Sequence, residues 1–349
     1  MIIKSQRITI KQVAKLAGVS YQTVSRVIND KGEVSPETRK RIQDIIDQYG
    51  YKPSAVARSL SQKRSYTLGV VTAGLKYIGP SMILNGMTDE ADELGYALIL
   101  KKLPKFHTNN VQPIFEALLA QHVDGIIWAV PQVGENQKWL EEQTSPLPVP
   151  FMFLTASLRS DLSSVDHDNY LGGKMATEHL LLQGYRKIGH ISGPLDWLSA
   201  RQRKKGWEDA LQEAGIDPEE MPCVEGDWSS ASGVPAFTHL LSDDPEVEAV
   251  FVANDQMALS VLQLACKKGI KIPDDLGVVG FDGIAESEYF WPPLTTVSQD
   301  LHALGATAVK EIVNIIELLY EGEEKIEAKQ IILPPKLIIR ESSRKKIDH

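Results

Sequence analysis

The chain has 349 residues and a mass of 38.7 kDa, enough for two or three domains that each bury a hydrophobic core. Hydrophobic residues make up 43% and charged residues 24%, which are ordinary globular values. No apolar run approaches the roughly 18 to 20 residues that span a bilayer, and the first ten residues lack the apolar stretch of a secretory signal. The composition therefore excludes a membrane-spanning protein, and we expect a cytoplasmic one.

The chain contains two cysteines, Cys223 and Cys266, which do not form a Cys-x-x-Cys pair. Neither a disulfide framework nor a zinc site of the usual kind is encoded. We expect buried, reduced thiols, and we expect no metal and no cofactor.

The net charge of −9 is distributed unevenly along the chain. Through Tyr66 there are thirteen Lys and Arg against five Asp and Glu, a net charge of +8, whereas the remainder carries −17. A basic segment is most often a solvated surface, but an acidic body would itself repel phosphate. The local concentration of positive charge therefore favours nucleic-acid binding near the N-terminus, if the local pattern supports it.

Two short helices joined by a turn are predicted near the N-terminus. Thr9 is a good N-cap, Gln12 can complete a capping box, and the apolar residues of 10–17 fall at helical spacing. Gly18 allows a sharp turn, Ser20 can cap a second helix, and apolar side chains recur at helical spacing after it. This pattern predicts a helix-turn-helix.

The second helix of this pair carries side chains suited to reading DNA. Tyr21, Gln22 and Arg26 point away from its apolar side, in or near its first two turns. Such positions reach base edges in the major groove, where Gln and Arg make bidentate hydrogen bonds. The alternative is a solvent-facing helical hairpin with incidental polar residues.

A third helix is predicted from Ser35 as N-cap and Pro36 at the first helical position to Gly50. The segment 51–66 then reads as a linker with a short helix, too short to be stable alone. Leu60 is a large apolar side chain in this otherwise small, polar or basic segment. It could pack on the following domain or act as a wedge between base steps in the minor groove.

From Thr67 onward, short apolar runs alternate with helical stretches in two successive rounds, which predicts two doubly wound parallel α/β sheets. Two such lobes would face each other across a cleft, with ligands at the carboxyl ends of the strands. Polar or aromatic residues collect at those ends: Arg203, Trp228, Asn254, Asp255 and Asp282. Carboxylate, amide and guanidinium groups bind neighbouring hydroxyls, and Trp offers an apolar face to a sugar ring. Each residue also has a structural alternative, such as a helix N-cap at Asn254 or Asp255 and a turn at Asp282.

The motifs TIKQVAKLAGVSYQTVSRVIN, ISGPLDWLSARQRKKGW, EGDWSSASG, FVANDQMALS, VVGFDG and PPLTTVSQD resemble those of the lactose repressor (LacI/GalR) family of bacterial transcription regulators, along nearly the whole chain. The resemblance implies a helix-turn-helix headpiece at 1–50, a hinge with a short helix at 51–66, and a core of periplasmic-binding-protein type. Its N-terminal lobe would comprise 67–165 and 297–328, and its C-terminal lobe 166–296 and 329–349, with chain crossings near Val165, Val297 and Lys329.

Site residues follow from the resemblance, motif by motif. Tyr21, Gln22 and Arg26 would read bases, Thr9, Ser20, Ser25 and Asn29 would hold phosphates, and Leu60 would be the minor-groove wedge. The effector contacts would be Pro80, Ile83, Ser199, Arg203, Trp228, Asn254, Asp282 and Gln299. The resemblance leads us to expect a carboxylate at Thr155 and an aromatic residue at Leu301, and this chain has neither. Tyr77 and Trp128 add bulk on the N-terminal lobe, so the identity of the effector stays open.

The resemblance implies a repressor that binds a palindromic DNA operator as a homodimer and is released by a saccharide, with a β-galactoside as one candidate. A corepressor-dependent regulator of the same family is the alternative. A sugar-binding transport protein or an enzyme is the alternative from another class, but the phosphate-loop, dinucleotide and hydrolase-elbow motifs are missing from the sequence. His167 beside Asp166 and Asp168 is the histidine cluster worth noting, and we interpret it as a hydrogen-bonded loop.

Overall fold

The computed structural model describes residues 8–28, 32, 34–51, 64–106, 110–136, 138–139, 148–154 and 161–344. The chain divides into two compact units, Met1–Tyr66 and Thr67–His349, so the basic segment and the acidic body are separate units. No helix in the described ranges is both long enough and apolar enough to span a bilayer.

The first unit contains three helices: α1 (Ile10–Ala17), α2 (Tyr21–Ile28) and α3 (Pro36–Tyr49). Thr9 and Gln12 form the predicted capping box, and Ser35 caps α3 with Pro36 in its first turn. The backbone N–H of Thr23 donates to the Ser20 hydroxyl at 3.1 Å, which caps α2. The three helices enclose a small core of Val13, Ala14, Ala17, Val24, Val27 and Ile42. The predicted helix-turn-helix is therefore confirmed, whereas the expected hinge helix lies outside the described residues.

The first sheet of the second unit is entirely parallel, in the order β11-β5-β4-β3-β1-β2. Its strands are β1 (Thr67–Thr72), β2 (Ala97–Lys102), β3 (Gly125–Ala129), β4 (Phe151–Leu154), β5 (Ser164–His167) and β11 (Gln330–Leu333). Its helices are α5 (Ile78–Glu93), α6 (Gln112–Leu119) and α12 (Leu301–Glu321). Successive residues of β3 face α12 and α6 in turn, which places helices on both sides of this sheet.

The second sheet has the order β12-β10-β9-β8-β6-β7, and β12 runs antiparallel to β10 at its edge. Its strands are β6 (Ile188–Ser192), β7 (Cys223–Glu225), β8 (Ala249–Val252), β9 (Gly277–Asp282), β10 (Thr295–Ser298) and β12 (Lys336–Ile338). Its helices are α8 (Asn169–Leu182), α9 (Leu198–Glu213), α10 (Ser230–Asp243) and α11 (Asp255–Lys268), with short 3-10 turns at η1 (Pro218–Glu220), η2 (Ala285–Tyr289) and η3 (Glu341–Ser343). Alternate residues of β8 pack toward α10 and α11 or toward α8 and α9, so this lobe is also doubly wound.

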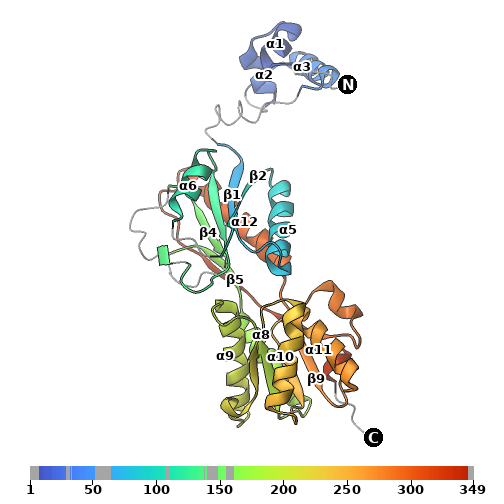
Figure 1. The fold of residues 1–349 in the computed structure, drawn as a ribbon. Helices are drawn as coiled ribbons and strands as arrows, with labels where there is room; N and C mark the ends of the chain where they lie inside the picture. Colours follow the sequence, from blue (N-terminus) through green and yellow to red (C-terminus); the bar gives the residue numbers. More distant parts are fainter. Residues whose placement is uncertain are drawn as a thin grey trace. The chain divides into compact units, whose positions relative to one another are not determined.

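The chain passes between the lobes three times (Figure 1), slightly later than expected. It leaves the first sheet at Asp168, after β5, and returns between β10 and α12 at Gln299–Asp300. The third crossing lies at Pro334–Pro335, because β11 still pairs with β5 in the first sheet. The boundaries expected at Val165, Val297 and Lys329 are therefore early, and the third is wrong by about one strand. The third crossing lies later because β11 pairs with β5 as far as Leu333, and the strand ends where Pro334 cannot continue the ladder.

Both cysteines are free and exposed, so the expectation of buried thiols is wrong. Cys223 begins the edge strand β7, and Cys266 lies near the end of α11. The protein around the Cys223 thiol nevertheless raises its pKa to about 11, mainly by desolvation, which leaves it protonated near neutral pH. The described residues contain no cluster of His, Cys, Asp or Glu suited to a metal ion.

Candidate functional site

The outward face of α2 presents the three side chains expected to read bases. Tyr21 is 53% exposed, and Gln22 and Arg26 are also exposed, whereas Val24 and Val27 are buried in the three-helix core. Packing therefore fixes which side of α2 faces outward, and the three polar side chains lie on it. A helix that offers an amide, a phenol and a guanidinium on one exposed face is suited to the major groove.

The expected phosphate contacts have a structural role as well. The Thr9 hydroxyl caps α1 and the Ser20 hydroxyl caps α2, and both residues are exposed. Each therefore marks a helix N-terminus, where backbone N–H groups and the helix dipole favour an anion. Ser25 is half-buried on α2. Asn29 and Leu60 lie outside the described residues.

In the second unit, Arg203 is the centre of a cleft between the lobes. It lies on α9 and is 6% exposed. Its Nε donates to Asn169 Oδ1 at 2.9 Å, and its Nη2 donates to Gln299 Oε1 at 3.3 Å. Its Nη1 donates to the Ala253 carbonyl at 2.5 Å and to Asp282 Oδ1 at 3.2 Å. These four hydrogen bonds tie together the residue that follows β8, the last residue of β9, the first residue of α8 and the second chain crossing.

Arg203 and Asp282 form an ion pair in which the guanidinium is buried and the carboxylate is half-buried. Burial raises the pKa of the Asp282 carboxyl, and the charge and hydrogen bond of Arg203 oppose that rise. Burial likewise lowers the pKa of Arg203, with Asp282 acting in the opposite direction. Asp282 has φ of 97° and Trp228 has φ of 72°, in a region that side chains with a Cβ rarely adopt. Strained backbone at two cleft residues is typical of a functional site held in place by its surroundings.

Asn254 is the N-cap of α11 and also lies at the cleft. Its Oδ1 accepts from the Met257 N–H at 2.9 Å and so caps α11, while its Nδ2 donates to the Trp228 carbonyl at 2.9 Å. It also lines the cleft. Asp255 instead lies beneath the cleft and is fully buried, with its carboxylate accepting from Thr296 Oγ1 at 2.7 Å and the Ile284 N–H at 2.9 Å.

Three connected cavities make up the cleft. The central cavity, of about 100 Å³, is lined by seven of the eight expected effector residues: Pro80, Ser199, Arg203, Trp228, Asn254, Asp282 and Gln299. The eighth, Ile83, lines a second cavity of about 120 Å³ that shares Arg203 and Gln299 with the first. The structure thus brings together side chains that the sequence distributes over more than 200 positions.

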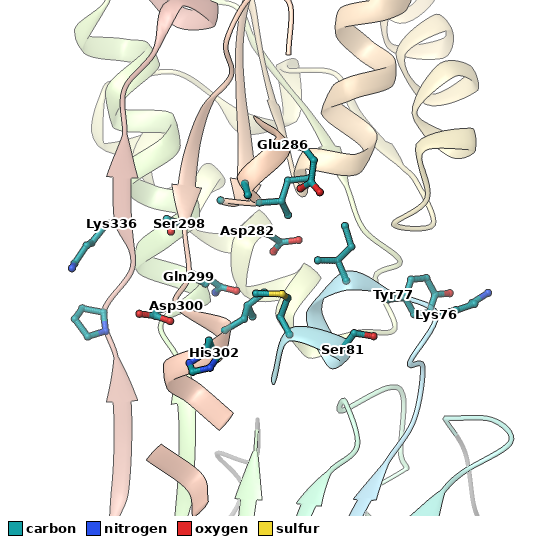
Figure 2. A pocket seen from close by; sticks show the side chains of 17 residues that line it. Lys76, Tyr77, Ser81, Asp282, Glu286, Ser298, Gln299, Asp300, His302 and Lys336 are labelled. Carbon is teal, nitrogen blue, oxygen red and sulfur yellow. The ribbon is translucent and has the colours of Figure 1, made fainter. Parts of the chain in front are cut away.

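The third cavity is the largest, at about 670 Å³, and shares Asp282 and Gln299 with the central one. In Figure 2 it extends between the lobes from Lys76 and Tyr77 on one side to Lys336 on the other. Its charged side chains are of both signs, since Lys76 and Lys336 line it together with Glu286 and Asp300. A ligand anchored at Asp282 therefore has space for a further ring or substituent on this side.

Several cleft residues were not singled out from the sequence as effector contacts. Asn169 orients both Arg203 and Gln299, whose Nε2 donates to Asn169 Oδ1 at 3.0 Å. Trp197 and Tyr77 line the central cavity, and Leu301 lines all three cavities. Tyr77 and Trp197 each directly precede the first helix of their lobe. An aromatic residue at that place in both lobes was the signal in the sequence that could have identified them.

Trp128 does not add bulk to the cleft, contrary to expectation. It is fully buried on β3, where its ring packs against Phe115 and Trp139 in the core of the first lobe. Successive side chains of a strand point to opposite faces of the sheet, and Trp128 points to the face that packs in the core of the first lobe. Thr155 lies outside the described residues.

The His167 cluster lies at the end of β5, beside the second cavity. Burial, together with the charge of Arg203, lowers the pKa of His167 to about 4, so its imidazole is neutral near pH 7. Burial raises the pKa of Asp166 to about 6, although its carboxylate accepts from the His167 backbone N–H at 2.7 Å. Asp168 caps α8 through the Leu171 N–H at 2.8 Å. The two aspartates thus make hydrogen bonds typical of a structural loop, whereas both ring nitrogens of His167 are buried without a hydrogen-bond partner among the described residues.

Comparison with known proteins gives consistent matches over both units. Residues 9–54 match the family described as bacterial regulatory proteins, lacI family, and residues 177–343 match a periplasmic binding protein-like domain. The lactose operon repressor of Escherichia coli (strain K12) is 34% identical over 308 residues, covering 88% of this chain and 84% of that protein.

Two solved structures extend the match to nearly the whole chain. The crystal structure of the lac repressor dimer bound to operator and the anti-inducer ONPF superposes with a TM-score of 0.83 at 33% identity, covering 97% of this chain and 99% of that one. The complex of the transcriptional regulator CelR with cellobiose gives a TM-score of 0.70 at 31% identity, covering 96% and 100%.

Proposed function

Because this chain belongs to the lacI family of bacterial regulatory proteins, and is therefore a DNA-binding transcription regulator, we propose that it represses its target genes as a homodimer on a palindromic operator and is released by a saccharide. The DNA contacts are those expected from the sequence: Thr9, Ser20, Tyr21, Gln22, Ser25, Arg26, Asn29 and Leu60. The effector contacts are Pro80, Ile83, Ser199, Arg203, Trp228, Asn254, Asp282 and Gln299. The protein would act in the cytoplasm, where bacterial DNA lies.

The observation that carries the effector assignment is the convergence of seven expected side chains on one cavity around Arg203 and Asp282. The guanidinium is already neutralised by the half-buried carboxylate of Asp282, so the cavity favours a neutral ligand with several hydroxyls over a free anion. Trp228 adds an apolar face against which a pyranose ring can pack. These features together favour a saccharide.

The size of the cleft favours a saccharide larger than one ring. The cavity of about 670 Å³ adjoins Asp282 and falls within the range of small-molecule sites. A β-galactoside remains one candidate, since the lactose operon repressor is among the relatives, and a β-glucoside such as cellobiose is another, given the CelR–cellobiose complex.

The test is a titration of a palindromic operator with the purified full-length protein, with and without lactose, cellobiose, methyl β-D-galactoside, D-galactose and D-glucose. We expect one of these sugars to weaken operator binding by about 5 to 150-fold, the usual range of allosteric coupling. A sugar that tightened operator binding would instead establish the corepressor alternative. If none of the sugars bound in calorimetry, both the β-galactoside and the β-glucoside candidates would be wrong.

We propose no catalytic activity. The relatives named above are regulators, and His167, which is neutral near pH 7, lies in the wall of the second cavity beside Asp166, whose carboxylate already accepts from a backbone N–H. Hydrolysis of 4-nitrophenyl β-D-galactoside or β-D-glucoside by the purified protein would contradict this.

A further inference from the structure

The two lobes enter their first helices in the same way. In the first lobe, the segment from Thr72 to Tyr77 connects β1 to α5, and in the second, the segment from Ser192 to Trp197 connects β6 to α9. Tyr77 and Trp197 are the N-cap residues of these helices, and neither side chain makes a capping hydrogen bond. Each lobe therefore places a ring, rather than a polar cap, at the same point of its fold.

These two rings meet across the lobes. Tyr77 and Trp197 lie edge to face, with centroids 6.1 Å apart and planes at 82°. Phe106, from the first lobe, lies 4.8 Å from Trp197 and 6.1 Å from Tyr77, and Trp228, from the second lobe, lies 5.7 Å from Trp197. Centroid separations of this size are typical of favourable aromatic pairs. We call these four residues the aromatic latch cluster.

The cluster joins the cores of both lobes. Tyr77 packs against the core of the second lobe although it belongs to the first, whereas Phe106 packs against the core of the first. A Cβ at Gly74 would lie 2.6 Å from Phe106, and one at Gly193 would lie 2.2 Å from Trp228. Each lobe thus has a glycine that leaves space for a ring of the cluster.

A short backbone bridge adjoins the cluster. The Gly134 N–H donates to the Asp196 carbonyl at 2.7 Å, and the Leu198 N–H donates to the Gln132 carbonyl at 3.1 Å, on either side of Trp197. Residues 131–136 of the first lobe are held in position by Asn136. Its Oδ1 accepts from the Val133 N–H at 3.2 Å, and its Nδ2 donates to the carbonyls of Pro131 and Phe106 at 2.7 and 2.9 Å. One buried side chain therefore organises both the bridge and the position of Phe106.

We propose that the aromatic latch cluster and this backbone bridge form a non-covalent latch that holds the lobes in the orientation seen here. It is a fourth junction, in addition to the three chain crossings. The second and third crossings border the largest cavity through Gln299, Asp300 and Pro334, and three rings of the latch, Tyr77, Trp197 and Trp228, border the central cavity. Rotation of one lobe against the other must break the edge-to-face contact and both bridging hydrogen bonds together.

The latch also contacts the cleft directly. Tyr77, Trp197 and Trp228 all line the central cavity around Arg203. An occupant of that cavity therefore touches rings from both lobes and changes the free energy of their contact. Differential contact with two lobe orientations is the physical requirement for a ligand to shift the balance between them.

Hydrogen exchange tests the latch without a ligand, because the bridging amides belong to Gly134 and Leu198. In the full-length protein carrying Tyr77→Leu and Trp197→Leu, we expect these two amides to exchange at least ~10-fold faster than in the unmodified protein, since local opening would no longer break aromatic contacts. Amides of the central strand β8 should be unchanged. Leu182→Ala is the control, because Leu182 is 84% exposed on α8 and lies outside the cleft, and it should leave both amides unaffected.

Asn136→Leu removes the hydrogen bonds that hold the backbone bridge in the first lobe and leaves every aromatic ring in place. It should accelerate exchange of the same two amides. Unchanged exchange at Gly134 and Leu198 in both variants would overturn the proposal. Equal acceleration of the β8 amides in both variants would also overturn it, since the bridge would then open only with the whole core.

Discussion

The guanidinium of Arg203 lies 3.8 Å from the centre of the Phe281 ring on β9. The next residue of that strand, Asp282, forms an ion pair with the same guanidinium. The aromatic face and the carboxylate together hold a planar cation in one orientation. The cleft therefore depends on the shape of arginine as well as on its charge.

Arg203→Lys should abolish most of the response to the effector while leaving operator binding intact. Lysine keeps the charge but loses the planar fork that bonds Asn169, Ala253, Asp282 and Gln299, and it cannot stack on Phe281. We expect at least a ~10-fold weaker affinity for the saccharide that the panel identifies, measured by calorimetry. Lys205→Arg on the same helix, where Lys205 makes an exposed ion pair with Asp209, is the control. A full response in Arg203→Lys would place the effector elsewhere.

Asp255 should make the core less stable as pH rises from about 4 to 7. Burial raises the pKa of its carboxyl to about 7, above its value in the unfolded chain. The folded state therefore retains a proton that the unfolded state releases in this interval, so the free energy of unfolding falls as pH increases. Asp255→Asn cannot titrate, so urea unfolding should show a smaller pH-dependent loss of stability over this range.

Asp255→Asn also carries a separate cost where the amide nitrogen opposes the Ile284 N–H, which cannot accept, although the Thr296 hydroxyl can accept from it. That cost does not depend on pH, so the slope of stability against pH is the informative quantity. An identical slope in the two proteins would show that Asp255 does not titrate in this range.

The sequence predicts the local elements well because their signals are local. Thr9 with Gln12, and Ser35 with Pro36, determine helix ends through contacts three residues apart. Alternating apolar runs likewise predict the two doubly wound sheets. The exposed face of α2 follows from its own periodicity, so Tyr21, Gln22 and Arg26 could be placed without a tertiary structure.

The crossings and the interlobe contacts are not local, and the sequence predicts them poorly. The third crossing depends on the register of Gln330 against Ser164, which no neighbouring residue specifies. Asn169 looks like an ordinary residue at a helix start until Arg203, 34 positions away, donates to it. The contact between Tyr77 and Trp197 joins residues of different lobes, so it exists only once both lobes are folded and placed together.

Arg26→Ala should weaken binding to the specific operator by roughly 1 to 3 kcal/mol and binding to random DNA by much less. Arg26 is exposed on the same face of α2 as Gln22, where its fork can reach a guanine edge. Gel-shift titrations on both DNAs at one fixed salt concentration measure the difference. Lys15→Ala, on the exposed side of α1, should instead weaken both by similar amounts. Equal losses for Arg26→Ala would identify a phosphate contact.

Trp291→Asp should dissociate the proposed homodimer. Trp291 and Tyr289 are 86% and 83% exposed in the segment before β10, and neighbouring exposed aromatic side chains are typical of residues that dominate an interface. A carboxylate at position 291 would be buried without a partner in such an interface, so sedimentation should show a monomer at concentrations where the unmodified protein is dimeric. Leu182→Asp is the matched control, because Leu182 is 84% exposed on α8 without an aromatic neighbour among the exposed residues of that helix. Since a dimer engages both halves of a palindrome, the monomeric variant should also lose operator affinity while it keeps its effector affinity. If Leu182→Asp dissociated the protein and Trp291→Asp did not, the interface would lie on α8 instead.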